Sequence, residues 1–216
     1  RRAVRALAMK GAGLTRTELG HVAGLSGIFM LRMLGLFLVL PVLSVHALTL
    51  EGASPLLAGM AVGFYGLSQT LFTVPMGLLS DRLGRKPVIA AGLLLYAFGS
   101  VVAATSGGIG QLLLGRFLQG AGAISSAVIA LAADLTREEV RGRAMAVMGI
   151  SIGLSFTIGL GLGPVLSARW GVPSLFWTTA ALDLVAIAYL FTMVPTPARE
   201  KPLDVSWSHV GAILKD

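Results

Sequence analysis

The chain has no cysteine and only 12% charged residues among its 216 positions. Without cysteine there is no disulfide framework, so the sequence does not indicate a redox compartment. A soluble domain usually carries about 25% charged residues. This chain is instead 55% hydrophobic, with a mean hydropathy of +0.83. A soluble core could not absorb so much apolar surface, whereas a lipid bilayer can.

Patterns typical of bond chemistry are also missing from the sequence. We find no cluster of metal ligands, no Walker-type phosphate loop and no nucleophile with a partner histidine and acid. We therefore expect no enzyme activity, no metal and no cofactor.

The net charge of +7 does not indicate nucleic-acid binding, because the basic residues lie in short loops between apolar runs. A cleavable signal peptide is not expected either, because the first twenty residues are basic and polar and no cleavage site follows a short apolar core.

Long apolar runs are what the sequence has in place of these features. A membrane-spanning helix needs about 20 mostly apolar residues. Candidate spans run over 21–48, 55–79, 87–105, 109–133, 144–166 and 174–194. Glycine, proline and charged residues separate them. The predicted fold class is an all-α membrane protein with six transmembrane helices.

Lys and Arg are distributed unequally between the two sets of loops. One set, with the two chain ends, holds nearly all of them outside the spans, and the other holds only Arg169. The positive-inside rule then predicts that both ends are cytoplasmic. We expect a cytoplasmic segment over 1–20, a bundle over 21–195 and a linker over 196–216 at or near the membrane surface. Trp207, Val210, Ile213 and Leu214 share one face of that linker, which fits either an interfacial helix or a frayed tail.

Spans 1–3 and 4–6 resemble each other weakly. Arg32 in span 1 and Arg116 in span 4 are each a lone arginine in the first span of a triplet. Because each triplet has an odd number of spans, the second would be inverted relative to the first. Inverted three-helix repeats are a common architecture of secondary transporters.

A charged turn separates spans 2 and 3. It reads Gly77-Leu-Leu-Ser-Asp-Arg-Leu-Gly-Arg-Lys86 and combines one acid with three bases and two glycines. A generic basic loop would account for Arg82, Arg85 and Lys86. It would not account for Gly77, Asp81 and Gly84 at this spacing.

This turn resembles the signature loop between helices 2 and 3 of the major facilitator superfamily of secondary transporters. Arg116-Phe-Leu-Gln-Gly120 resembles a second pattern of that family, in helix 4. Span 5 is similar to the glycine-rich, Gly-Pro-ending motif of the drug:proton antiporter branch, through Gly149, Gly153, Gly159, Gly163 and Pro164. These glycines are also expected to let helices pack closely, and Pro164 to bend the end of its helix.

The resemblance implies a conformational switch at the signature loop. Asp81 would contact a second half of the transporter, and Arg85 would pair with Asp134 at the end of span 4, followed by Arg137. Asp134 also has a simpler interpretation, as an acidic residue that ends a helix.

A second group of residues is expected at a central cavity or in proton coupling: Arg116, Gln119, Asp183, Arg32, Tyr65 and Gln69. A central arginine costs at least about 2.5–3.5 kcal/mol on insertion scales, so Arg116 would face a wet cavity or a partner unless it extends to the membrane surface. Asp183 could carry a proton or pair with a neighbouring helix or with Arg32. Arg32 could also reach the surface.

The leading hypothesis is a proton-coupled exporter of amphipathic small molecules in a bacterial inner membrane. The alternatives are a permease for a nutrient or metabolite, or a non-transporting membrane scaffold on the same fold. Members of the family have twelve helices, so the resemblance implies a second six-helix half, in the same longer chain or in a homodimer.

Overall fold

The computed structural model describes residues 13–195, which are helical almost throughout and contain no β-strand. The helices are α2 (Arg16–Ala47), α3 (Pro55–Leu83), α4 (Arg85–Ala104), α5 (Ile109–Ala121), α6 (Ser125–Asp134), α7 (Arg141–Trp170) and α8 (Val172–Met193), with a short 3-10 helix, η1 (Glu138–Val140). Within residues 13–195, six segments are long and apolar enough to span a membrane, with α5 and α6 forming the fourth together. The all-α, six-span prediction is confirmed.

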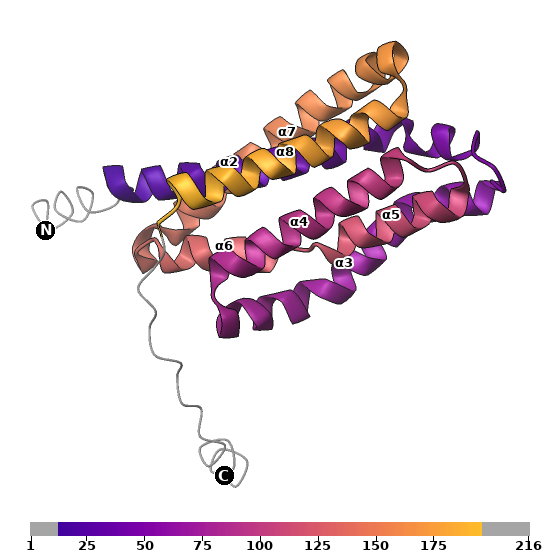
Figure 1. Cartoon of the computed structure of the whole chain (residues 1–216). Coiled ribbons are helices and arrows are strands. Elements are labelled where there is room, and N and C mark those ends of the chain that lie inside the picture. The colour runs from indigo at the N-terminus through magenta and orange to yellow at the C-terminus, as the bar shows by residue number, and fades with distance from the viewer. Residues whose placement is uncertain (1–12, 196–216) are drawn as a thin grey trace, which may run out of the picture.

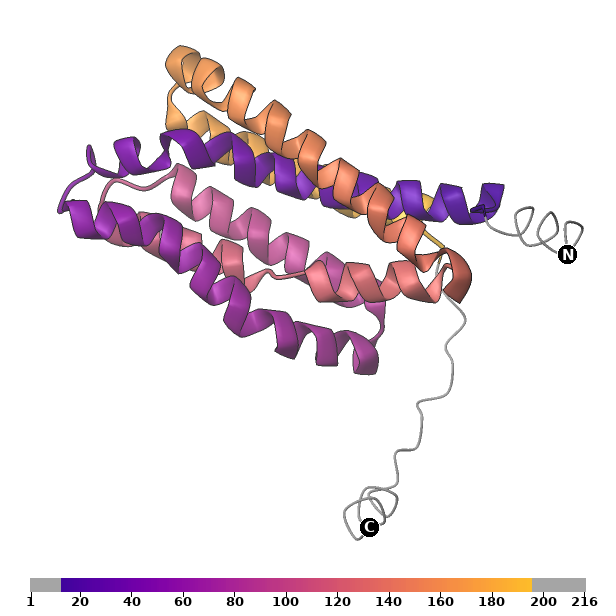
Figure 2. The ribbon, with the colours of Figure 1, turned by 180° about the vertical axis from the view of Figure 1, so that it is seen from behind.

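The helices form one elongated bundle with connections at its two ends (Figure 1). The α3–α4 and α6–α7 connections lie at the same end as the start of α2 and the end of α8, which Figure 2 shows from behind. This basic end, as we call it, carries Arg82, Arg85, Lys86, Arg137, Arg141 and Arg143. Arg169 lies at the opposite end of α7. Residues 1–12 and 196–216, which include the predicted linker, lie outside the described residues.

The packing of the helices repeats between the two triplets. Helix α2 packs chiefly on α7 and α8, and in the same way α5 packs chiefly on α3 and α4. Helices α4 and α8, the third member of each triplet, pack on each other. The first helix of each triplet thus packs on the second and third helices of the other triplet, as expected of two inverted three-helix repeats.

Local capping explains where the first helices begin. Helix α2 begins at Arg16 rather than at the predicted His21, because Thr15 and Glu18 form a reciprocal capping box. Helix α3 begins at Pro55 as predicted, with Ser54 accepting a hydrogen bond from the Leu57 amide.

Helix α7 is longer than the predicted span 144–166 at both ends, and it continues past Pro164 to Trp170. Pro164 therefore lies inside the helix rather than at its end.

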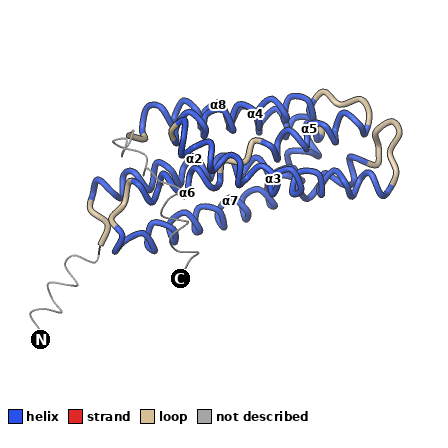
Figure 3. The backbone as a smooth tube through the Cα atoms, turned by 90° about the horizontal axis from the view of Figure 1, so that it is seen from below, coloured by secondary structure: helices blue, strands red, loops and turns tan. Residues whose placement is uncertain are grey.

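The fourth span is not the continuous helix that its composition predicts. It breaks at 122–124, between α5 and α6, and Figure 3 shows this loop in the middle of the bundle. Gly122 lies against α4, where an added Cβ would come within 2.4 Å of the Gly92 carbonyl oxygen. The break thus coincides with a close approach of two backbones that only glycine allows.

The glycines of α7 divide into two groups. An added Cβ at Gly163 would lie 2.1 Å from the Leu38 carbonyl oxygen, and one at Gly159 would lie 2.6 Å from the Phe37 Cβ, so this pair packs tightly on α2 as predicted. No described atom comes within 4 Å of a Cβ built at Gly149 or Gly153. This pair therefore faces away from the described bundle, and its expected role in helix packing stays a prediction.

Candidate functional site

Arg85 connects the signature loop to the end of the fourth span. Its Nε donates to Asp134 Oδ2 at 3.1 Å, and its Nη1 donates to Ser80 Oγ at 2.8 Å and also to Asp81 Oδ1. The pairing expected between Arg85 and Asp134 is present. Asp81 is paired with Arg85 inside the loop, and its side chain is 56% exposed.

The two glycines of the loop have different structural roles. Gly84 has a φ of 102°, in a region that non-glycine residues rarely adopt, and it joins the end of α3 directly to the start of α4. Gly77, on α3, packs against the start of α6, where an added Cβ would be 3.2 Å from Ser126 Oγ. Gly84 therefore sets the turn between two spans, and Gly77 allows α3 to approach α6.

The other two bases of the loop differ in their surroundings. Lys86 is buried, with its Nζ 6.0 Å from the centre of the Phe191 ring on α8. Arg82 is exposed.

Arg137 has a partner that the sequence analysis missed. Its Nε donates to Glu18 Oε1 at 2.9 Å, and its backbone amide donates to the same oxygen at 3.1 Å. These side-chain hydrogen bonds and the charge of Glu18 raise the pKa of the Arg137 guanidinium above its usual value. The capping-box spacing of Thr15 and Glu18 would have indicated that Glu18 begins a helix, but not that it binds Arg137.

Arg116 is buried inside the bundle and does not extend to the membrane surface. Its Nε donates to the Ala61 carbonyl at 3.0 Å and its Nη1 to Gln119 Oε1 at 2.7 Å. Gln119 in turn donates to Ser100 Oγ at 2.8 Å. The guanidinium lies 4.6 Å from the centre of the Tyr65 ring. Arg116, Gln119, Ser100 and Tyr65 form what we call the Arg116 network, and it joins α3, α4 and α5.

Tyr65 and Gln119 do not line an open cavity, which corrects the prediction. Tyr65 is 6% and Gln119 is 1% exposed, because both are held inside the bundle by Arg116. Gln69, one turn beyond Tyr65 on α3, is only half-buried.

Arg32 is also fully buried, and it binds the break in span 4. Its Nη2 donates to the Gly122 carbonyl at 3.2 Å, and its guanidinium lies 4.7 Å from the centre of the Tyr96 ring. Asp183 on α8 interacts with Arg32 electrostatically, but neither of its oxygens has a hydrogen-bond partner among the described residues. We call Arg32, Tyr96 and Asp183 the Arg32 cluster.

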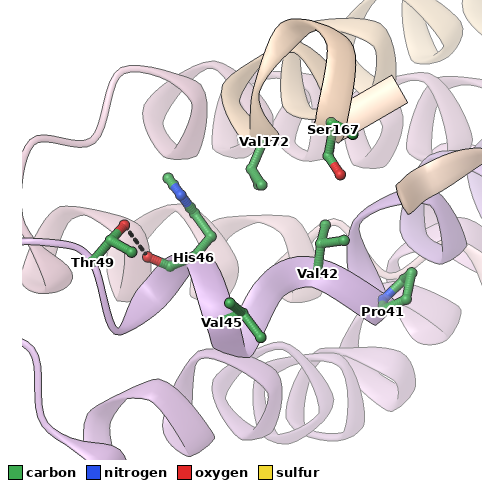
Figure 4. Close-up of a pocket in the computed structure, with 8 residues that line it drawn as sticks. Pro41, Val42, Val45, His46, Thr49, Ser167 and Val172 are labelled. Atoms are coloured by element: carbon green, nitrogen blue, oxygen red, sulfur yellow. Dashed lines mark hydrogen bonds between the residues drawn. The ribbon is translucent and has the colours of Figure 1, made fainter. Parts of the chain in front are cut away.

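An open pocket of about 290 Å³ lies away from these groups (Figure 4). It is lined by residues near the end of α2, including Pro41 and His46, and by Ser167 and Val172 where α7 meets α8. It shares no residue with the Arg116 network or the Arg32 cluster.

The sequence of residues 25–216 matches the family model described as Major Facilitator Superfamily. The chain belongs to this superfamily. It is 52% identical over 172 residues to the inner membrane transport protein YajR of Escherichia coli, an alignment that covers 80% of this chain and 38% of that protein. It is 38% identical over 192 residues to an uncharacterized transporter of Buchnera aphidicola subsp. Schizaphis graminum, covering 89% of this chain and 49% of the relative.

Solved structures show the same fold. The human organic anion transporter MFSD10 (TETRAN) aligns with a TM-score of 0.72 at 23% identity, over 88% of this chain and 52% of that one. A peptide transporter, POT, aligns with a TM-score of 0.70 at 16% identity, over 90% of this chain and 44% of that one. The chain spans less than half the length of the two curated relatives above.

Proposed function

We propose that this chain forms half of a secondary transporter that exports amphipathic small molecules in exchange for protons, by alternating access. The observation that carries the proposal is the Arg116 network. A guanidinium stays charged in proteins, and an ionisable residue buried in a span is by default a functional candidate. Arg116 is 1% exposed in the fourth span; the Ala61 carbonyl of α3 holds it directly, and Ser100 of α4 is linked to it through Gln119.

The outward face of the bundle supports a mechanism with two moving halves. Spans α3 and α7 are the least covered by the rest of the bundle, and they lie along one side of it in Figure 3. These two helices carry four glycines that have no described atom within 4 Å of a built Cβ: Gly59, Gly63, Gly149 and Gly153. Small residues let helices approach closely. This face would pack on a second six-helix half, and its smooth surface would allow the halves to rock.

The signature loop would bias the two access states. Arg85 joins α4 to α6 through Asp134, and the exposed Asp81 would also contact the second half in one state. A partly exposed ion pair contributes only about 0–1 kcal/mol. Because alternating access needs two states of similar free energy, a bias of that size changes their populations.

The proposal is tested with the complete native protein in proteoliposomes that contain a fluorescent amphipathic dye. An imposed pH gradient should drive the dye against its own concentration gradient, and reversing the pH gradient should reverse the movement. Dye movement that ignores the pH gradient would favour a facilitative permease. No dye movement, with uptake of a polar metabolite instead, would favour a nutrient carrier.

A further inference from the structure

We infer that the Arg32 cluster is a proton-controlled switch, in which a proton on Asp183 leaves Arg32 free to hold the break in span 4. This inference rests on the proposed function, since a proton-coupled carrier needs a group that binds the proton. It adds which carboxyl binds the proton and which part of the fold responds.

Helix packing places Arg32 and Asp183 at the same depth in the bundle. Helices α2 and α8 run in opposite directions and cross where Thr179 Oγ1 donates to the Gly35 carbonyl at 3.1 Å. Arg32 comes about one turn before Gly35, and Asp183 comes one turn after Thr179. Because the helices are antiparallel, both steps go from the crossing point towards the basic end, so the two side chains lie at the same depth along the bundle.

The polar atoms of the cluster are buried but largely unbonded. Arg32 Nε and Nη1, the Tyr96 hydroxyl and both Asp183 oxygens lack a hydrogen-bond partner among the described residues. Arg32, Tyr96 and Asp183 are each 0% exposed. An ionised carboxylate without any bond would be very costly in this environment, and the guanidinium would be drawn to it. The observed arrangement is therefore the one expected when Asp183 is neutral.

In this arrangement Arg32 binds the break instead of the acid. Its Nη2 donates to the carbonyl of Gly122, in the non-helical segment between α5 and α6. Non-helical backbone inside a membrane needs partners from the protein. If Asp183 lost its proton, its carboxylate would compete for the same guanidinium with a stronger, charge-assisted bond.

The switch has two states and one chemical step. A proton adds to an Oδ atom of Asp183 and later leaves the same atom, and otherwise only hydrogen bonds change. With the proton bound, Arg32 holds Gly122. Without it, Arg32 moves to Asp183 and releases the break. Because α5 carries Arg116 and Gln119 just before this break, the charge of Asp183 would alter the geometry of the Arg116 network.

Few other charged groups compete for Asp183. Of the helices that pack on α8, α4 brings Tyr96 at this level and Lys86 at its basic end, and α2 brings Arg32. Helix α7 has its charged residues only near its two ends: Arg141, Arg143 and Arg169.

The inference is tested by infrared difference spectroscopy of the complete protein in lipid, recorded between low and high pH without substrate. The carbonyl stretch of a protonated carboxylic acid should disappear as the pH rises. Asp183→Asn should abolish this signal, whereas Asp134→Asn, which changes a carboxylate at the basic end, should retain it. Asn resembles the neutral acid, so the variant should fold.

The same infrared titration of Arg32→Gln is a second test, and it does not depend on how much folded Asp183→Asn protein is obtained. Without the guanidinium, the ionised form loses its stabilising charge, so the acid signal should persist to higher pH. A signal that survives in Asp183→Asn, or a titration unchanged in Arg32→Gln, would overturn the inference. Because no substrate is present, these results are independent of the dye assay. Proton-driven dye flux without an infrared signal from Asp183 would support the proposed function and rule out the Arg32 cluster as its proton switch.

Discussion

The Nε atom of Arg85 lies 3.1 Å from Oδ2 of Asp134, which ties the first turn of α4 to the last residue of α6. The two residues are 49 positions apart in the sequence. Arg85 also holds Asp81, one turn back along the chain. One guanidinium therefore joins three spans at the basic end, so changes at any of the three residues should act on the same equilibrium.

Asp134→Asn should change the rate of transport while leaving the protein well inserted. The Arg85 and Asp134 side chains are 20% and 40% exposed, so their pairing should contribute no more than about 1 kcal/mol. That corresponds to up to about a fivefold shift between access states. Turnover in proteoliposomes and the amount of protein in the membrane measure the two effects separately.

Arg85→Ala should have a larger effect on turnover than Asp134→Asn, because it removes both ion pairs. Arg169→Ala is a matched control, since Arg169 lies at the opposite end of the bundle over Trp170. Turnover at the wild-type rate in Arg85→Ala would show that the loop is only a basic anchor.

Arg116→Ala should uncouple flux from the pH gradient and also reduce stability. The variant leaves the Gln119 carbonyl oxygen without its donor, and an unsatisfied buried polar group costs about 1–3 kcal/mol. The proton-to-substrate ratio and the thermal midpoint in detergent measure the two effects. Arg116→Lys should recover part of the stability without recovering the Tyr65 contact geometry, since a lysine lacks the planar guanidinium. An unchanged coupling ratio in Arg116→Ala would remove this residue from the site.

Gly163→Ala and Gly153→Ala should behave differently although both glycines lie on α7. At Gly163 the new methyl group would meet the Leu38 carbonyl oxygen at 2.1 Å, so α2 and α7 must separate and stability should fall. At Gly153 no atom of the described residues lies within 4 Å of the added methyl group, and alanine favours a helix by up to about 1 kcal/mol, so stability should not fall.

The Gly153 variant also tests the outward face. If this face packs on a second half, Gly153→Ala should slow transport without lowering the thermal midpoint. Gly159→Ala is the comparison variant, since its methyl group would meet Phe37 of α2 inside the bundle. Normal transport by Gly153→Ala would contradict that use of the face.

Much of the fold follows from the apolar runs and from the glycine, proline and charged residues that separate them. A bilayer requires long helices, so the Ser54-Pro55 start and the Gly84 turn could be located from the sequence alone. The break at Gly122 could not, because it depends on the backbone of α4 reaching that point. The start of α2 at Arg16 was missed because charged residues precede the apolar run.

The candidate site was predictable in its residues but less so in its contacts. The Arg85–Asp134 pair follows from the family resemblance. The burial of Tyr65 and Gln119 depends on where the Arg116 guanidinium points, which spacing along a helix does not determine. Glu18 was overlooked because its partner, Arg137, lies 119 positions away.

The measurement that tests the account most directly is proton movement driven by substrate. The complete protein is placed in proteoliposomes with an amphipathic dye inside, no initial pH gradient and a pH indicator in the lumen. Dye leaving through an antiporter should draw protons in and acidify the lumen, and Arg116→Ala should lose the acidification. Dye efflux with no change in luminal pH, or with alkalinisation, would contradict proton antiport.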